Sequence, residues 1–280
     1  MKLATLIGAQ ELAAQGNDLL IVDCRFDLAD SARGARDYAQ AHVPGAVYAD
    51  LNRDLSDLSK PGLGRHPLPD AAAFCALLGR WGWTPQTRVV AYDDANGALA
   101  AARLWWMLGL VGAREIAVLD GGLAAWKAAG LPLNAQAATR EQTVVAVEFD
   151  ASEIVYTGQL HRLREDPATL IVDARAAPRF RGENETIDPV GGHIPGARNR
   201  PFSENLQADG RFKSALVLRA EIDALLGAHT PDTVIHHCGS GVTACHNLLA
   251  FAHAGLSGSR IYAPSWSGWI ADPGNPIERG

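Results

Sequence analysis

The chain has 280 residues, of which 48% are hydrophobic and 20% are charged, and its formal net charge is −6. This composition is that of an ordinary globular protein, and the length allows one large domain or two of average size. No stretch gathers five or six lysines or arginines, which argues against nucleic acid and anionic membranes as partners. The apolar runs are too short for a membrane-spanning helix or a signal peptide, so we expect neither.

The first half of the chain predicts strands that alternate with helices. Short apolar runs at residues 19–22 and 88–92 suit buried parallel strands. Apolar residues recur at helical spacing over residues 70–80 and 98–109. The polar stretch near residues 134–145 predicts a linker.

The second half predicts the same alternation. Strands are expected at residues 169–172 and 233–237, and helices at residues 218–227 and 242–254. Strands that alternate with helices in this way form a parallel sheet covered by helices on both faces. The predicted fold class is therefore α/β.

Two motifs recur in the same order in both halves. Leu20–Arg25 (LIVDCR) returns as Leu170–Arg175 (LIVDAR), and His42–Ala46 (HVPGA) returns as His193–Ala197 (HIPGA). The aspartate of the first motif precedes the histidine of the second by 19 positions in one copy and by 20 in the other. This agreement indicates two copies of one domain. The predicted boundaries are residues 1–133 for the first domain, 134–145 for the linker and 146–280 for the second domain.

The chain contains four cysteines: Cys24, Cys75, Cys238 and Cys245. Because so few cysteines in so long a chain do not make a disulfide scaffold, we expect a protein of the reducing cytoplasm. His236 and His237 precede Cys238, but neighbours on a strand point to opposite faces and cannot easily share a metal. We therefore expect neither a metal nor another cofactor.

The loop that follows the strand at 233–237 is the most informative part of the chain. It consists of Cys238, Gly239, Ser240, Gly241, Val242 and Thr243, and the predicted helix follows. Backbone N–H groups of such a loop converge on the cysteine, and the positive end of the helix dipole favours a thiolate. When the two copies are aligned, Asp93 of the first copy corresponds to Cys238 of the second copy. A carboxylate cannot carry a transferable sulfur, so we expect the first copy to be non-catalytic.

The doubled His-x-Pro-Gly-Ala motif, the loop from Cys238 to Thr243 and the segment Ser265–Trp269 resemble the tandem rhodanese family. Its members are thiosulfate and 3-mercaptopyruvate sulfurtransferases. The resemblance implies two rhodanese-like domains and a sulfur atom carried on Cys238 as a persulfide, which the N–H groups of Gly239 to Thr243 would hold. It also implies a small anionic sulfur donor. The acceptor would be cyanide or a thiol, either a small thiol or a thioredoxin-like protein.

The resemblance further places a donor-binding arginine at Arg179 and makes His42, with Ser240, a candidate proton relay, although turn and packing roles are the favoured interpretation of both His42 and His193. Mercaptopyruvate enzymes of the family often carry a second arginine in the stretch equivalent to residues 183–192, which here has no cation. Thiosulfate enzymes carry basic residues directly after the cysteine, whereas this loop is neutral. We favour 3-mercaptopyruvate as the donor, and a thiosulfate-specific enzyme is the alternative.

Two other functions are open to a cysteine-headed loop. A cysteine phosphatase needs an arginine at the sixth position after the cysteine, where this chain has Ala244, so phosphate ester hydrolysis is disfavoured. The chain could instead be a persulfide carrier or a redox sensor that acts without turnover. Steady product release would distinguish an enzyme from a carrier, which would give one stoichiometric burst.

Overall fold

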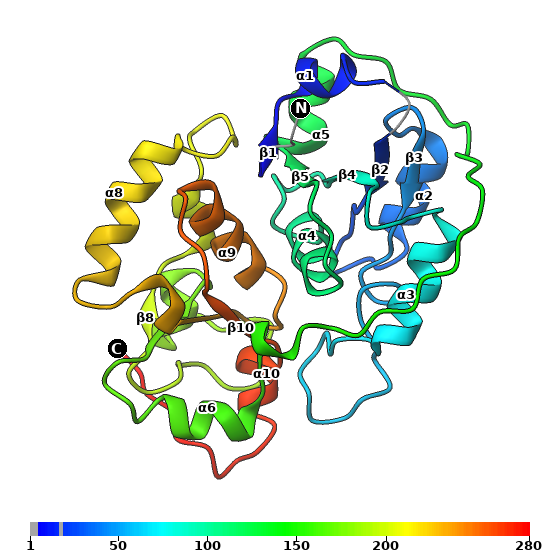
Figure 1. Cartoon of the computed structure of the whole chain (residues 1–280). Helices are drawn as coiled ribbons and strands as arrows, with labels where there is room; N and C mark the ends of the chain where they lie inside the picture. The colour runs from blue at the N-terminus through cyan, green and yellow to red at the C-terminus, as the bar shows by residue number, and fades with distance from the viewer. Residues whose placement is uncertain (1–4, 17–18) are drawn as a thin grey trace. The chain divides into compact units, whose positions relative to one another are not determined.

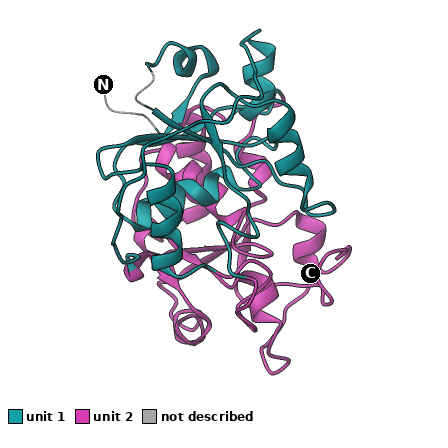
Figure 2. Cartoon of the chain, turned by 90° about the vertical axis from the view of Figure 1, so that its right-hand side faces the viewer, with its two compact units in different colours: residues 1–57, 68–150, 209–211 teal, residues 58–67, 151–208, 212–280 magenta. Residues whose placement is uncertain are grey.

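The computed structural model describes residues 5–16 and 19–280 and divides into two compact units (Figures 1 and 2). Unit 1 comprises residues 1–57, 68–150 and 209–211, and unit 2 comprises residues 58–67, 151–208 and 212–280. The short segment 58–67 therefore belongs to unit 2, although the chain on both sides of it belongs to unit 1. Within the described residues, no helix is long and apolar enough to cross a membrane.

Unit 1 contains one parallel sheet with the strand order β1-β5-β4-β2-β3. Its strands are β1 (Leu6–Ile7), β2 (Leu19–Asp23), β3 (Ala46–Tyr48), β4 (Arg88–Tyr92) and β5 (Ile116–Leu119). Its helices are α1 (Ala9–Ala13), α2 (Arg33–Gln40), α3 (Ala71–Arg80), α4 (Ala101–Leu110) and α5 (Gly122–Ala128).

Unit 2 repeats this plan with the strand order β6-β10-β9-β7-β8, again all parallel. Its strands are β6 (Ile154–Val155), β7 (Leu170–Asp173), β8 (Arg198–Asn199), β9 (Val234–His237) and β10 (Arg260–Tyr262). Its helices are α6 (Thr157–Leu163), α7 (Ala177–Arg181), α8 (Ala215–Leu226), α9 (Ala244–His253) and α10 (Ser265–Trp269). Each strand of unit 2 occupies the place of its counterpart in unit 1, which confirms the predicted α/β fold and its duplication.

The eight elements predicted from the sequence are all present, and their ends agree to within three residues. Helix α4 begins at Ala101 and not at residue 98, because the N–H groups of Leu99 and Ala100 donate to the Asp93 carboxylate and Ala100 has a non-helical φ of −152°. Helix α8 begins earlier than predicted, because the Ser214 hydroxyl accepts a hydrogen bond from the Val217 N–H and caps the helix. The short strands β1, β3, β6 and β8 have too few residues to show a pattern in the sequence.

The polar stretch predicted as a linker lies along unit 1. Asn134 pairs with His42, the Arg140 guanidinium donates to the carbonyls of Trp81 and Leu19, and Thr143 donates to the Trp83 carbonyl. Unit 1 continues to Asp150 before the chain enters unit 2. The polar composition of the stretch reflects its place on the surface of the unit.

Alternate residues of each central strand face opposite layers of helices. In β9, Ile235 packs in a core cluster with Leu160 of α6 and Trp269 of α10. His236 points the other way, where its ring meets Phe251 of α9 edge-on at 4.6 Å. His236 and His237 therefore lie on opposite faces, as strand geometry requires.

The buried ring of His236 predicts sensitivity to acid. It is fully buried, neither ring nitrogen has a hydrogen-bond partner, and burial lowers its pKa to about 3. The unfolded state, with a pKa near 6.5, therefore binds the proton first as the pH falls, and the folded state loses stability below that value.

We expect His236→Leu to reduce the loss of unfolding free energy between neutral pH and about pH 5 by roughly 2 kcal/mol. Urea unfolding at the two pH values measures this. Any pH-independent effect of the substitution on stability cancels when the unfolding free energies at the two pH values are subtracted. The prediction would be contradicted if the variant and the original protein lost the same unfolding free energy between the two pH values.

Candidate functional site

The site forms around the loop between β9 and α9 at the carboxyl edge of the unit 2 sheet. Cys238 directly follows β9, is 2% exposed and leads into a loop in which Gly241 has a φ of +76°. A residue with a Cβ is strained at that angle, so Gly241 allows the loop to curl back before α9 begins. The positive end of this ten-residue helix favours negative charge near the cysteine.

The backbone of this loop offers donors to an anion. Among the residues that the structure describes, the N–H groups of Gly239, Ser240, Val242 and Thr243 donate to no protein acceptor. The Cys238 N–H itself donates to the Ser265 hydroxyl at 3.2 Å. Buried amides without partners are unfavourable, so this cradle is suited to an anion bound beside the sulfur.

Ser265 holds Cys238 from a distant part of the chain. It is the first residue of α10 and has a φ of +54°, which is uncommon for a residue with a Cβ. Its hydroxyl accepts from Cys238 and donates to the Tyr262 carbonyl at 3.0 Å. The Trp266 N–H also donates to the Cys238 carbonyl at 2.9 Å. These bonds fix the backbone on both sides of the sulfur-bearing side chain.

The equivalent loop of unit 1 already holds an anion. Asp93 follows β4 as Cys238 follows β9, and its carboxylate is fully buried. The carboxylate accepts five backbone N–H groups at 2.7–3.2 Å: Ala95, Gly97, Leu99, Ala100 and Ala101. The same position in the duplicated fold thus binds a covalently attached negative group in unit 1, which is the arrangement that a persulfide on Cys238 requires.

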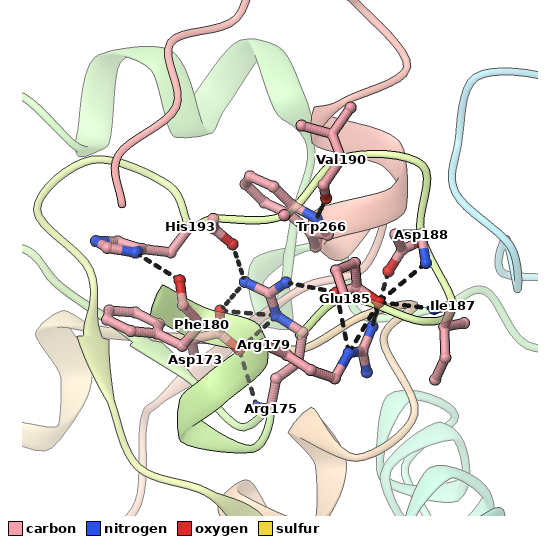
Figure 3. Close-up of polar contacts among 12 residues, drawn as sticks. Asp173, Arg175, Arg179, Phe180, Glu185, Ile187, Asp188, Val190, His193 and Trp266 are labelled. Atoms are coloured by element: carbon pink, nitrogen blue, oxygen red, sulfur yellow. Dashed lines mark hydrogen bonds and ion pairs between the residues drawn. The ribbon is translucent and has the colours of Figure 1, made fainter. Parts of the chain in front are cut away.

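Arg179 projects from the short helix α7 and meets Glu185 and Asp188 (Figure 3). Its Nε donates to both carboxylate oxygens of Glu185 at 3.0 Å, and its Nη2 donates to Asp188 at 2.9 Å. Because those bonds use Nε and Nη2, Nη1 remains for another anion. A Cβ placed on Gly239 would lie 3.8 Å from that Nη1, so the guanidinium lies directly over the loop.

The stretch 183–192, in which mercaptopyruvate enzymes of the family often carry a second arginine, contributes carboxylates in this protein. Burial acts to raise the pKa of Glu185, but hydrogen bonds from Arg179 and from the N–H groups of Asp188 and Ile187 outweigh it and lower the pKa. Burial raises the pKa of Asp188, and its two arginine neighbours do not fully offset this. The stretch therefore positions Arg179 and does not carry a cation of its own.

The second cation comes from segment 58–67. Arg65 forms an ion pair with Asp188, and its backbone N–H donates to the Ser267 hydroxyl at 3.0 Å. Its Nη2 would lie 2.9 Å from a Cβ on Gly239, while its buried Nε has no hydrogen-bond partner. The guanidinium thus occupies the space that a side chain at position 239 would take, which supplies positive charge to a loop that is neutral in sequence.

Ser240 and His66 form the hydrogen bond that a proton relay would need. Ser240 Oγ lies 2.8 Å from His66 Nδ1, and both residues are buried. The sequence placed this role on His42, whose Nδ1 lies 2.7 Å from the Tyr38 carbonyl and whose Nε2 lies 3.1 Å from the Gln136 carbonyl. His42 also stacks on Tyr38, as His193 stacks on Phe180 in the other copy. The repeated histidines thus occupy equivalent packing positions.

Sequence reasoning therefore missed Arg65, His66 and Ser265. A weak signal existed for the first two, because 43 positions separate Ala46 from Val89 whereas 37 separate the equivalent residues Ala197 and Val234. The longer stretch of the first copy contains segment 58–67. Nothing in the sequence indicates that this segment packs with the second copy.

The described residues hold no group of three or more histidines, cysteines or acids that could bind a metal ion. Ala244, at the position where a phosphatase requires arginine, is the first residue of α9 and is fully buried. The charged groups at the loop are instead the guanidinium groups of Arg65 and Arg179, which suit a small carboxylate or sulfonate anion.

Comparison with known proteins shows the family of the chain. A family model described as a rhodanese-like domain matches residues 8–129 and again residues 157–272. The chain belongs to the rhodanese family. The first match contains β2 to β5 of the unit 1 sheet and the second contains β7 to β10 of the unit 2 sheet, so the duplication seen in the sheets is a duplication of the rhodanese-like domain.

Several relatives of this rhodanese-family chain are named sulfurtransferases. A protein of Pseudomonas aeruginosa named a probable 3-mercaptopyruvate sulfurtransferase is 48% identical, and the alignment covers 100% of both chains. A protein of Mycobacterium tuberculosis with the provisional name thiosulfate sulfurtransferase is 39% identical over 98% of this chain and 97% of its own. The solved 3-mercaptopyruvate sulfurtransferase from Leishmania major superposes with a TM-score of 0.84 at 34% identity, over 94% of this chain and 73% of that chain.

Proposed function

We propose that this chain is a sulfurtransferase that moves the thiol sulfur atom of 3-mercaptopyruvate through a persulfide on Cys238 to a thiol or cyanide. The observation that carries the proposal is the position of Cys238 at the start of a loop in which four backbone N–H groups lack a protein acceptor, with the guanidinium groups of Arg65 and Arg179 close to Gly239. The names of the relatives support the same reaction. Unit 1, with Asp93 at the equivalent position, has a structural role.

In the first step, the Cys238 thiolate attacks the sulfur of mercaptopyruvate. A bond forms between the two sulfur atoms, the carbon–sulfur bond breaks, and its electron pair leaves with the carbon as the enolate of pyruvate. The proton of the donor thiol ends on that carbon, so pyruvate departs and Cys238 retains a persulfide anion. The unpaired N–H groups of Gly239, Ser240, Val242 and Thr243 stabilise this anion without rearrangement of the loop.

In the second step, the outer sulfur passes to the acceptor, and Cys238 returns to the thiolate. Because Cys238 is 2% exposed, the acceptor has to present a narrow group such as a thiolate tip or cyanide. The small acceptors are therefore cyanide and low-molecular-weight thiols, and a thioredoxin-like protein would insert only its cysteine. None of the four cysteines forms a disulfide, which supports a reducing compartment such as the cytoplasm.

Thiosulfate is the second candidate donor. Arg65 supports it, because this side chain adds the cation that the loop sequence lacks. Mercaptopyruvate remains favoured, because Asp188 and Glu185 neutralise the two arginines and leave little net charge for a dianion.

We assign the proton relay to Ser240 and His66. The enolate of pyruvate needs a proton, whereas the sulfite released from thiosulfate leaves without one. We therefore expect Ser240→Ala to lower kcat/KM for mercaptopyruvate by roughly tenfold or more and to affect thiosulfate less. Rates with both donors on the same preparation measure this, and an equal loss with both would contradict the relay.

The overall proposal is tested by treating the protein with either donor and measuring the mass of the peptide that contains Cys238. We expect the mass of one additional sulfur atom, together with steady release of pyruvate when a small thiol is supplied. A single stoichiometric release of pyruvate would instead indicate a persulfide carrier or a redox sensor.

A further inference from the structure

Four charged side chains with cancelling formal charges lie together near the Cys238 loop, and one of them, Glu185, also lies 3.6 Å from Arg175, which has Asp173 as its main partner. Arg65 and Arg179 are positive, and Asp188 and Glu185 are negative. Asp188 joins the cluster, because one of its carboxylate oxygens pairs with Arg65 and the other accepts from Arg179 Nη2 at 2.9 Å. The two cations over the loop are thus bridged by one carboxylate.

Asp188 lies behind the arginines as seen from solvent. Its side chain is 2% exposed, whereas those of Arg65 and Arg179 are 30% and 18% exposed. The Nη2 of Arg65 and the Nη1 of Arg179 remain directed to the loop beside Cys238. A donor anion would therefore contact the arginines, while Asp188 would act on it through their charge.

The stretch around Asp188 is held firmly in this position. The Glu185 carboxylate accepts the N–H groups of Ile187 and Asp188, and the Trp266 indole N–H donates to the Val190 carbonyl at 2.9 Å (Figure 3). Since burial disfavours the charged form of Asp188, a polar residue without charge would be easier to accommodate there. The carboxylate is therefore explained by its charge and not by the packing of the stretch.

We infer that Asp188 selects the sulfur donor by charge, because its carboxylate, shared between Arg65 and Arg179, lowers the positive potential over Cys238 and favours a monoanion over a dianion. The inference rests on the proposed function. Mercaptopyruvate carries one negative charge at its carboxylate, and thiosulfate carries two. Any increase in positive potential at the donor site is felt twice as strongly by the dianion.

Asp188→Asn removes one negative charge and keeps the size of the side chain. We expect the ratio of kcat/KM for thiosulfate to kcat/KM for mercaptopyruvate to rise by about tenfold in this variant, and the rise to shrink at high salt. Asp188→Glu restores the charge and should return the ratio toward that of the unmodified protein.

Two further variants separate charge selection from structural damage. Glu183→Gln removes a carboxylate from the same stretch, but Glu183 is 56% exposed and pairs with Arg181, so the ratio should not change. Glu185→Gln removes the other negative charge of the cluster and keeps an oxygen for the two N–H groups. It should shift the ratio in the same direction as Asp188→Asn, and it serves as the test if Asp188→Asn does not fold.

An unchanged ratio in both Asp188→Asn and Glu185→Gln, or an equal loss of kcat/KM with both donors, would overturn the inference. The proposed function would still stand in that case if Cys238 formed a persulfide. If the unmodified protein gained no sulfur from either donor, the proposed function would fail, and charge selection with it. A rise in the ratio in Glu183→Gln as large as that in Asp188→Asn would also overturn the inference, because a nonspecific change in net charge would then explain both.

Discussion

Replacing Cys238 with serine is expected to abolish sulfur transfer while leaving the fold intact. The serine hydroxyl is similar in shape to the thiol and can occupy the same position directly after β9, but it cannot form a sulfur–sulfur bond that is later broken. No sulfur should be gained by the peptide that contains residue 238, and neither pyruvate nor sulfite should be released above a few per cent of the original rate. Mass spectrometry and product assays on the same samples measure both quantities.

Cys245→Ser provides the matched control for this prediction. Cys245 lies in the first turn of α9, is fully buried, and its thiol donates to the Gly241 carbonyl at 3.4 Å. A serine can make the same hydrogen bond, so transfer should persist in this variant. Appreciable turnover in Cys238→Ser, or loss of transfer in Cys245→Ser alone, would show that the sulfur is carried elsewhere.

Replacing Arg179 with alanine is expected to raise KM for anionic donors by a factor equivalent to about 1–3 kcal/mol, roughly 5- to 150-fold. The guanidinium is lost from its place over Gly239, and the carboxylates of Glu185 and Asp188 lose a partner that compensates their charge. Both changes weaken the binding of an anionic donor. The increase should therefore be larger for thiosulfate than for mercaptopyruvate, because repulsion by the two carboxylates grows with the charge of the donor.

Arg181→Ala is the control for Arg179→Ala. Arg181 lies on the same helix, α7, but its side chain is 40% exposed and pairs with the exposed Glu183. Its removal changes the net charge of the protein by the same amount and should leave KM nearly unchanged. If the two variants behaved alike, or if Arg179→Ala left KM unaltered, the donor would be bound by other groups, of which Arg65 is the first to test.

Asp93 and Cys238 show that the two copies of the domain share an anion site at equivalent positions. Both copies of the domain place an anion at the end of the central strand and surround it with backbone amides. In unit 1 the anion is a side chain that cannot leave, and the loop is longer so that it can wrap around the carboxylate. In unit 2 the loop is shorter, the N–H groups of Gly239, Ser240, Val242 and Thr243 donate to no protein acceptor, and the side chain is a thiol that can take up and release a sulfur atom.

The two halves of the donor site were not equally open to prediction. Cys238 and its glycines could be recognised, because the strand, the loop and the helix that create their chemistry are consecutive in the chain. Arg179 followed from the resemblance to the rhodanese family, and the structure places it over the loop. The relay histidine was sought in a repeated motif, yet His42 and His193 repeat because both pack against an aromatic ring and pair with the backbone. Their repetition reflects the fold and not the reaction.

The amino-acid sequence by itself determined the duplication, the parallel α/β class, two strands and two helices of each copy, and the cysteine-headed loop at the end of β9. Hydrophobic periodicity, turn-forming residues and internal repetition are properties of neighbouring residues, so they can be read along the chain. Only the tertiary structure decided that Arg65 and His66 join unit 2, some 170 positions before the cysteine that they approach. Ion pairs and hydrogen bonds between distant segments depend on where the folded backbone brings them together. For that reason the charge balance set by Arg65, Arg179, Glu185 and Asp188 has no signature in the sequence.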